Sequence, residues 1–231
     1  MRAVMFDFSG TLFRVEPTGR WLRAVLADRG VHPDDDEIAR YAELLERAGA
    51  QPGGAPPERV PPRLRQLWRD RDLTARAHRA AYTGLSRGVA LPWDVHDALY
   101  DRHPTAAAWQ PYPDAAEVLG ALRERGVPVA VVSNIAWDVR PVFRAHGLDT
   151  LVDAYVLSYE HEVKKPAPEI FEIACAALGR APGETLMVGD DRTADMGAAA
   201  LGCPVLLVDH LPAEERPGAL RGVLDLLDRR A

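Results

Sequence analysis

The stretch Val4-Met5-Phe6-Asp7-Phe8-Ser9-Gly10-Thr11-Leu12, near the start of the 231-residue chain, decides the expected fold. The run from Ala3 to Phe6 is apolar without alternation, as is typical of a strand buried in a parallel sheet. Asp7 follows this strand directly. In open α/β sheets ligands bind beyond the carboxyl ends of the strands, so we expect the Asp7 carboxylate to face a substrate. A simple turn cap at Asp7 is the alternative that this stretch alone leaves open.

The turn after Asp7 has the composition of an anion-binding loop. Gly10 lets backbone amides approach an anion closely, and the Thr11 hydroxyl can bond either the turn or a bound ligand. Three later stretches of the chain bear on this interpretation.

From residue 109 onward, helical and strand patterns alternate along the chain. We predict strands at 127–132, 154–157, 185–188 and 204–208, and helices at 114–125, 138–146, 168–178, 193–201 and 219–229. Alternation of this kind implies right-handed crossovers and a parallel sheet covered on both faces. The expected fold class is α/β, with a Rossmann-like three-layer α/β/α core.

The segment 14–108 reads differently, because it contains helical patterns and loops but no convincing strand. Helices are expected at 18–29, 36–48, 64–85 and 94–102, around a loop rich in Pro and Gly at 51–62. We therefore predict a core domain of residues 1–13 and 109–231, with a small α-helical cap domain of residues 14–108 inserted after the first strand. The joining segments 13–17 and 108–113 are expected to act as hinges.

Composition limits the class of protein and its partners. Apolar residues make up 47% and charged residues 27% of the chain, as in ordinary globular proteins, and the formal net charge is −6. We expect no nucleic-acid or membrane partner, but a small anionic substrate remains compatible with this charge. Two cysteines provide no disulfide framework, and the first strand leaves no room for a signal peptide, so we expect a cytoplasmic location. A monomer or a homodimer is expected.

Two further stretches place polar residues next to expected elements, one after a strand and one before a helix. Ser133 and Asn134 follow an apolar run and can each donate a hydrogen bond to a phosphate-like oxygen. Lys164 and Lys165 precede an expected helix, whose amino terminus adds positive potential. In isolation, Ser133 and Asn134 fit turn chemistry better than phosphate binding, and a pair of lysines usually belongs to solvated surface.

The stretch Val188-Gly189-Asp190-Asp191-Arg192-Thr193-Ala194-Asp195 contains three carboxylates at the end of a buried strand. They would repel one another unless a cation lies among them. Oxygen ligands with room for water suit Mg²⁺ better than Zn²⁺. A helix cap made by Asp191 or Thr193 would explain one of these residues but not all three carboxylates.

With Asp7, Ser133, Lys165 and Asp190 in this order, the sequence resembles the haloacid dehalogenase-like hydrolase superfamily. The resemblance covers about 1–13 and 109–210, and the helical insertion resembles the α-helical cap of its small-molecule phosphatases and dehalogenases. It implies an aspartyl intermediate on Asp7, group binding by Ser133 and charge neutralisation by Lys165. It also implies a Mg²⁺ site, whose ligands would be Asp7, the backbone carbonyl of Ser9, and Asp190, with Asp191 or Asp195 completing or orienting the metal shell.

Ser9 departs from the pattern of the family's phosphatases, which carry a second Asp two residues after the nucleophile. A serine hydroxyl is a poor general acid or base near neutral pH, and losing such help typically lowers the rate by about 10²–10⁴-fold. Segment 14–108 contains no lysine, which argues against a phosphonatase with a Schiff-base lysine in the cap. The acidic set argues against dehalogenation, because the family's dehalogenases use no metal.

Three functions remain open at this point. The first is a Mg²⁺-dependent phosphatase that is slow or restricted to good leaving groups such as acyl phosphates. The second is a catalytically weak phosphate-binding or regulatory protein. The third is a 2-haloacid dehalogenase-like hydrolase. In the cap, several side chains are candidates for facing the substrate: Arg20, Arg23, Arg40, His78, Arg79, Tyr82 and Trp93.

Overall fold

A computed structural model describes residues 1–229, and the chain divides into two compact units. The core unit comprises residues 1–14 together with the described residues from 111 onward, and the helical unit comprises residues 15–110. The predicted boundaries after residues 13 and 108 fall within two residues of these divisions. The assignment of the helical unit as a cap stays a prediction.

The core unit is built on a parallel sheet. Within the described residues its strands are β1 (Ala3–Phe6), β4 (Val129–Ser133), β5 (Ala154–Leu157), β6 (Thr185–Gly189) and β7 (Val205–Leu207), in the order β5-β4-β1-β6-β7. β1 occupies the centre, where Phe6 pairs with Val131 of β4 and Val188 of β6. An apolar, fully buried first strand suits this central position between two parallel neighbours. The predicted α/β Rossmann-like class is confirmed.

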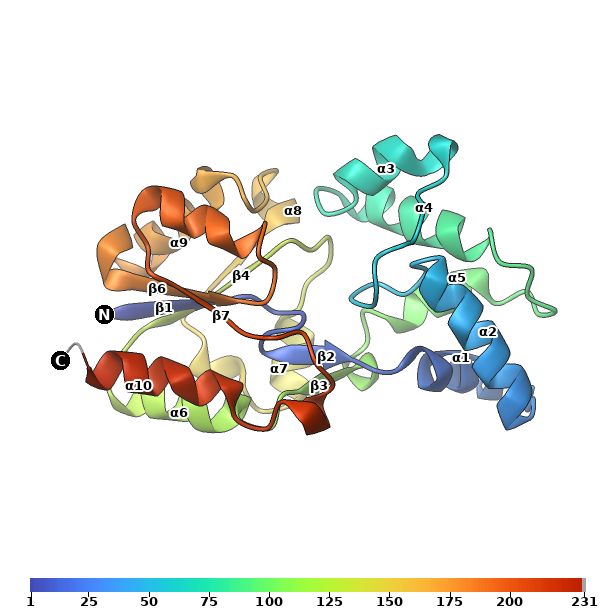
Figure 1. Cartoon of the computed structure of the whole chain (residues 1–231), viewed down its shortest axis with the longest axis horizontal. Coiled ribbons are helices and arrows are strands. Elements are labelled where there is room, and N and C mark those ends of the chain that lie inside the picture. The colour runs from blue at the N-terminus through green and yellow to red at the C-terminus, as the bar shows by residue number, and fades with distance from the viewer. Residues whose placement is uncertain (230–231) are drawn as a thin grey trace. The chain divides into compact units, whose positions relative to one another are not determined.

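Helices cover both faces of this sheet. Figure 1 shows α9 (Pro168–Leu178) on one face and α6 (Ala115–Glu124) with α10 (Gly222–Asp228) on the other. The remaining helical elements of the core unit are α7 (Arg140–Ala145), α8 (Ser158–His161), and the short 3₁₀ segments η3 (Asp149–Leu151), η4 (Pro182–Glu184), η5 (Asp195–Leu201), η6 (Ala213–Glu215) and η7 (Ala219–Arg221). Phe171 of α9 packs with Met5 and Met187 in one buried cluster. Burial of these apolar faces holds the layers together.

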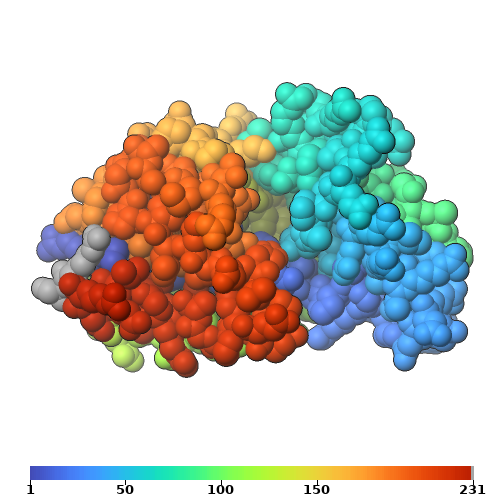
Figure 2. All heavy atoms as spheres, viewed as in Figure 1, coloured from blue at the N-terminus to red at the C-terminus, as the bar shows by residue number. Residues whose placement is uncertain are grey.

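The helical unit has its own hydrophobic core. Its elements are α1 (Thr18–Ala27), α2 (Asp35–Arg47), η1 (Pro62–Leu64), α3 (Arg65–Asp70), α4 (Ala75–Ser86), α5 (His96–Arg102) and η2 (Ala106–Ala108). Fully buried Trp21 lies in this core, and its indole N–H donates to the Leu99 carbonyl at 3.0 Å. Figure 2 shows the atoms on one face of this unit, from α1 and α2 in blue to α4 and α5 in cyan and green.

The structure corrects several predicted elements. A short strand, β2 (Phe13–Val15), pairs with β3 (Trp109–Pro111), although no strand was expected within 14–108. Its three residues pair with a segment distant in sequence, so no local pattern marks them. The expected single helix at 64–85 is divided between α3 and α4, because Thr74 starts a new helix by accepting a hydrogen bond from the Ala77 amide. The expected helix at 193–201 is the 3₁₀ segment η5.

None of the helices in the described part of the chain combines the length and apolar character that a membrane crossing requires. This finding comes from residues 1–229 alone.

Candidate active site

Parallel strands bring the predicted polar residues to one edge of the sheet. Asp7 follows β1, Ser133 ends β4, and Asp190 follows β6. Because β1 pairs in parallel with both β4 and β6, the three positions lie at the same carboxyl edge. The two strands that flank β1 thus display their terminal side chains on either side of Asp7.

Asp7 and Asp195 share Lys165 as a buried partner. The Lys165 Nζ lies 2.9 Å from Asp7 Oδ1 and 2.6 Å from Asp195 Oδ1, and all three residues are buried. Asp7 Oδ1 also accepts the Phe8 amide at 2.8 Å, while Asp195 Oδ2 accepts the Asp191 amide at 2.9 Å. These donors fix the orientation of both carboxylates before any ligand binds.

Asp190 stands beside the turn that follows Asp7. Its Oδ1 accepts the Thr11 hydroxyl at 3.1 Å, and its Oδ2 lies 2.6 Å from Nδ1 of His210. Gly10 has a φ of +79°, and a β-carbon there would lie only 2.3 Å from Asp190 Oδ2 and 2.3 Å from His210 Nδ1. Only glycine can therefore bring the turn this close to Asp190. Gly189 meets a similar restriction, because its β-carbon would lie 2.1 Å from Asp195 Oδ2.

The protonation of this cluster follows from burial and charge. Burial raises the pKa of Asp7 to about 7, with the carboxylates of Asp195 and Asp190 adding to the rise and Lys165 opposing it. Burial alone lowers the pKa of Lys165, but the adjacent carboxylates of Asp195 and Asp7 outweigh it and the net pKa is raised. Lys165 is thus a permanent cation, whereas Asp7 needs more positive charge nearby to stay fully ionised at neutral pH.

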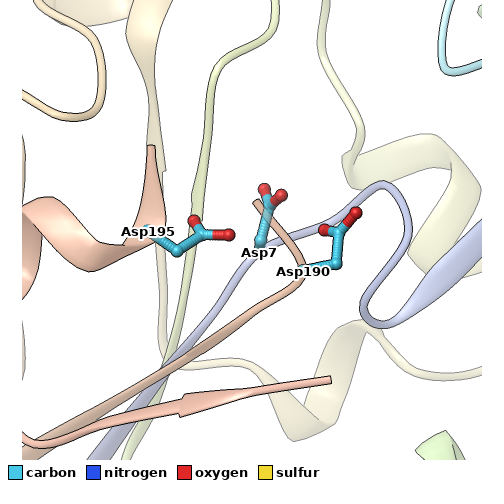
Figure 3. Close-up of side chains that lie close together, drawn as sticks. All are labelled: Asp7, Asp190 and Asp195. Carbon is cyan, nitrogen blue, oxygen red and sulfur yellow. The ribbon is translucent and has the colours of Figure 1, made fainter. Parts of the chain in front are cut away.

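Three carboxylates form a set of oxygen donors suited to a metal ion. Asp7, Asp190 and Asp195 each offer an oxygen, and these oxygens lie within 4.8 Å of one another. Figure 3 shows the three side chains gathered from three different segments of the core unit. One lysine cannot balance three carboxylates, and an all-oxygen set fits Mg²⁺ better than Zn²⁺. The donor chemistry thus fits the predicted cation.

The other predicted metal residues have different surroundings. The exposed carboxylate of Asp191 accepts the amides of Thr193 and Ala194 at 2.7 and 2.9 Å, so its side chain caps the following turn. This is the capping alternative that the sequence left open for one of the three acids. Ser9 is half-buried in the turn after Asp7, and its backbone carbonyl stays a predicted ligand.

The predicted phosphate-binding residues Ser133 and Asn134 lie at the same edge. Ser133 is buried at the end of β4. The Asn134 side chain donates to the Lys165 carbonyl at 2.9 Å and accepts the Lys165 amide at 2.7 Å. Asn134 therefore orients the segment that carries Lys165. A direct contact of Ser133, Asn134 or Thr11 with phosphate stays a prediction.

The family comparison agrees with this geometry. The haloacid dehalogenase-like hydrolase family matches residues 1–202. The chain belongs to this family. Ribulose-1,5-bisphosphate 5-phosphatase from Halopiger xanaduensis is 31% identical over 229 residues, an alignment covering 92% of this chain and 86% of that protein.

Relatives of a second kind are dehalogenases. (S)-2-haloacid dehalogenase 1 from Pseudomonas sp. strain CBS-3 is 29% identical over 127 residues, which cover 54% of this chain and about half, 55%, of that enzyme. The crystal structure of L-2-haloacid dehalogenase from Xanthobacter autotrophicus superimposes with a TM-score of 0.64 at 24% identity, covering 93% of this chain and 80% of that one. The latter likeness shows the shared fold.

The predictions of superfamily and enzyme class are confirmed by these comparisons. The chain is a haloacid dehalogenase-like hydrolase with phosphatase relatives, so the enzyme assignment holds. Its metal requirement and the effect of Ser9 stay predictions.

Most of the candidate side chains in the helical unit have partners of their own. Arg23 contacts Asp35 at 2.6 Å, and Arg79 pairs with Asp101 and Asp97. His78 and Tyr82 are buried. Their predicted contacts with substrate stay predictions.

Sequence reasoning missed two side chains beside the turn that follows Asp7 in this hydrolase. His210 contacts Asp190, and buried Arg216 donates hydrogen bonds to the turn carbonyls of Gly10 and Thr11. His210 lies shortly after β7, so the rule that polar residues after parallel strands gather at one edge would have found it. No comparable signal marks Arg216, which lies in an irregular segment between η6 and η7.

Proposed function

We propose that this hydrolase is a Mg²⁺-dependent phosphatase that works through an aspartyl-phosphate on Asp7. The observation that carries the proposal is the cluster of Asp7, Asp190 and Asp195, whose three carboxylates lie together while Lys165 pairs with Asp7 and Asp195. When bound there, Mg²⁺ would supply positive charge to the phosphoryl oxygens and lower the pKa of Asp7. The phosphatase among the relatives supports a small phosphorylated substrate.

The geometry of Asp7 suggests which oxygen attacks. Oδ1 is engaged by Lys165 and by the Phe8 amide, so we assign the attack on phosphorus to Oδ2. The new Oδ2–P bond forms as the bond from phosphorus to the leaving oxygen breaks. Water then attacks the same phosphorus, which releases phosphate and restores the Asp7 carboxylate. Lys165 stabilises charge on the phosphoryl oxygens in both steps.

Ser9 determines which substrates turn over. Its hydroxyl cannot protonate a departing alkoxide well, and the leaving oxygen must depart unprotonated or take its proton from water. We therefore expect acyl phosphates and aryl phosphates to react faster than alkyl phosphates. General acid–base help is worth about 10²–10⁴-fold, so the difference should be large.

The test is phosphate release from acetyl phosphate, p-nitrophenyl phosphate, ribulose-1,5-bisphosphate and a series of alkyl phosphates. Wild type, Asp7→Asn and Ser9→Asp are compared with Mg²⁺ and with EDTA. The proposal requires activity that needs both Asp7 and Mg²⁺, falls steeply as the leaving group becomes more basic, and rises for alkyl phosphates in Ser9→Asp. Folded wild type whose phosphate release equals that of Asp7→Asn would refute it.

Dehalogenation is the second candidate, because a 2-haloacid dehalogenase is among the relatives. Asp7 would then attack the carbon that carries the halogen, halide would leave, and water would hydrolyse the resulting ester. Halide release from 2-haloacids in EDTA, lost in Asp7→Asn, would establish this reaction. The cluster of three carboxylates, which a divalent cation would suit, favours the phosphatase.

A further inference from the structure

The segment after β7 runs back to the turn that follows Asp7, although it lies beyond the residues 1–202 that match the family. Arg216 of this segment is buried, with only 4% of its surface exposed. Burying a guanidinium is costly unless its donors are satisfied, so its partners show what it does.

Arg216 joins three segments of the core unit through its guanidinium. Nη1 donates to the carbonyls of Gly10 and Asp209, the latter at 3.0 Å, and Nη2 donates to the Thr11 carbonyl. The guanidinium carbon lies 3.2 Å from the centre of the Tyr112 ring. A planar fork can hold two successive carbonyls and stack on an aromatic face at once, which a lysine ammonium cannot do.

Tyr112 adds to the same attachment. Its amide donates to the Leu12 carbonyl at 2.9 Å, and its hydroxyl donates to the Leu211 carbonyl at 2.7 Å. Both Arg216 and Tyr112 thus connect the turn to the segment after β7. The hydrogen bonds of Arg216 go to neutral carbonyls, and its burial lowers its pKa because water is excluded from the charge.

We propose that Arg216 is a positioning residue that holds the nucleophile turn, residues 8–13, in the geometry that catalysis needs. Gly10 packs so closely against Asp190 and His210 that a small shift of the turn changes the relation of Asp7 to Asp190. The Ser9 carbonyl, a predicted metal ligand, lies in the same turn. The effect on turnover rests on the proposed function, whereas the effect on the turn does not.

Amide hydrogen exchange tests the attachment without any activity. Three turn bonds are the readout: Gly10 N–H to Phe13 O at 2.7 Å, and Leu12 and Phe13 N–H to Phe8 O at 3.1 and 2.9 Å. In Arg216→Lys these amides should exchange at least about 10-fold faster, because releasing the turn lowers its local opening free energy. The matched control is Arg221→Lys, an exposed arginine paired with Glu117 in the same segment, which should leave them unchanged.

Kinetics then test the catalytic consequence. Because misplacement by about 1 Å costs about 10²-fold in rate, we expect kcat to fall about 10–100-fold in Arg216→Lys and Arg216→Ala with little change in KM. Guanidinium chloride at a low, non-denaturing concentration should restore part of the activity of Arg216→Ala and none in Arg221→Ala. Restoration would separate positioning from general destabilisation.

The two proposals fail in different ways. If wild type releases no phosphate, the proposed function fails, and the exchange of the turn amides still judges Arg216. If Arg216→Lys folds with wild-type exchange in residues 8–13, the positioning role is refuted whatever the activity. Should Arg216→Ala not fold, the exchange measurement on Arg216→Lys still decides.

Discussion

Two buried ion clusters in the molecule show how differently charge can be used. In the helical unit, the fully buried carboxylate of Glu16 meets Arg102 in a two-pronged contact, with Nε to Oε1 at 2.6 Å and Nη2 to Oε2 at 2.9 Å. In the core unit, three carboxylates lie close together, and Lys165 pairs with two of them, Asp7 and Asp195. Glu16 also has Arg20 at 3.5 Å, so the first cluster has no surplus negative charge, whereas the carboxylates of the second outnumber its lysine.

The balance of charge within each cluster indicates whether the cluster has a structural or a functional role. The hydrogen bonds that Arg102 donates to the Glu16 carboxylate raise the pKa of Arg102, as expected when two opposite charges stabilise each other. At Asp7 the surplus has the opposite result, because burial and neighbouring carboxylates raise the pKa of the acid to about 7. Ionised Asp7 is therefore unfavourable in this cluster, and a bound cation would stabilise it.

The largest effect is expected when the more buried cation of each cluster is removed. Lys165→Met and Arg102→Met should each lower the free energy of unfolding by about 3–5 kcal/mol at pH 8, because Lys165→Met leaves Asp7 and Asp195 without their shared cation and Arg102→Met leaves Glu16 with only the more exposed Arg20 at 3.5 Å. Urea unfolding followed by circular dichroism measures both. Adding Mg²⁺ or Mn²⁺ should distinguish the two variants, because the cation should restore stability to Lys165→Met but not to Arg102→Met.

Lys164→Met is the matched control, because it removes a lysine one residue away that is half-buried rather than buried. Its effect should be smaller than that of Lys165→Met, because a half-buried charge is better solvated than a buried one. Equal responses of Lys165→Met and Arg102→Met to the divalent cation would remove the distinction between the clusters.

The sequence predicted the elements whose physical cause is local. β1, β5 and α9 have the predicted bounds, because an unbroken apolar run or a helix that opens at Pro168 and ends at Gly179 is visible within a few residues. β2 was missed because its three residues become a strand only through pairing with β3. The carboxyl-edge rule placed Asp7, Ser133 and Asp190 together without any knowledge of distances.

The next comparison neutralises one acid in each cluster, and the two results should have opposite signs. In EDTA at pH 8, Asp7→Asn should raise the free energy of unfolding by roughly 1–4 kcal/mol, since a shift of one pKa unit corresponds to about 1.4 kcal/mol. Glu16→Gln should lower it by about 1–3 kcal/mol, because Arg102 loses its charged partner. Urea unfolding curves of the two variants measure this difference.

The pH dependence fixes the cause of the Asp7 effect. The pKa of Asp7 is about 7 in the folded protein against 3.8 in the reference state, so the folded state holds more protons between these values. Its unfavourable contribution therefore grows as pH rises from about 4 to 7 and is absent below about 4. If Asp7→Asn gains as much stability at pH 4 as at pH 8, ionisation of Asp7 is not the reason.

Contacts between distant segments were beyond the sequence. No sequence pattern around Arg216 indicates that its guanidinium bonds the carbonyls of Gly10 and Thr11, because some two hundred positions separate Arg216 from these residues. The same holds for the bonds of Asn134 to the backbone of Lys165, whereas its contact with phosphate stays a prediction. Polar residue types mark a site in sequence, whereas their partners depend on the fold.

The smallest expected effect concerns a third kind of buried group, histidine that remains neutral. Burial lowers the pKa of His103 to about 4 and that of His78 well below 6.5. His103 Nδ1 bonds the Tyr100 carbonyl at 2.7 Å, and His78 Nδ1 contacts the Tyr100 hydroxyl at 2.8 Å. Neither contact offers a carboxylate that would hold the charged form in place.

The sign of this effect is opposite to that of Asp7. Below about pH 6.5 the unfolded chain protonates His103 while the folded protein does not, so stability falls as pH decreases towards 4. Between pH 8 and 5.5 the loss should be about 1.4 kcal/mol for this residue. Urea unfolding is measured in the Asp7→Asn background, because this variant lacks the opposite pH dependence of stability that Asp7 causes. Adding His103→Gln should then reduce the loss of stability between pH 8 and 5.5 by about 1.4 kcal/mol. An unchanged slope in His103→Gln would mean that His103 is protonated in the folded helical unit, and that this unit too tolerates an unbalanced buried charge.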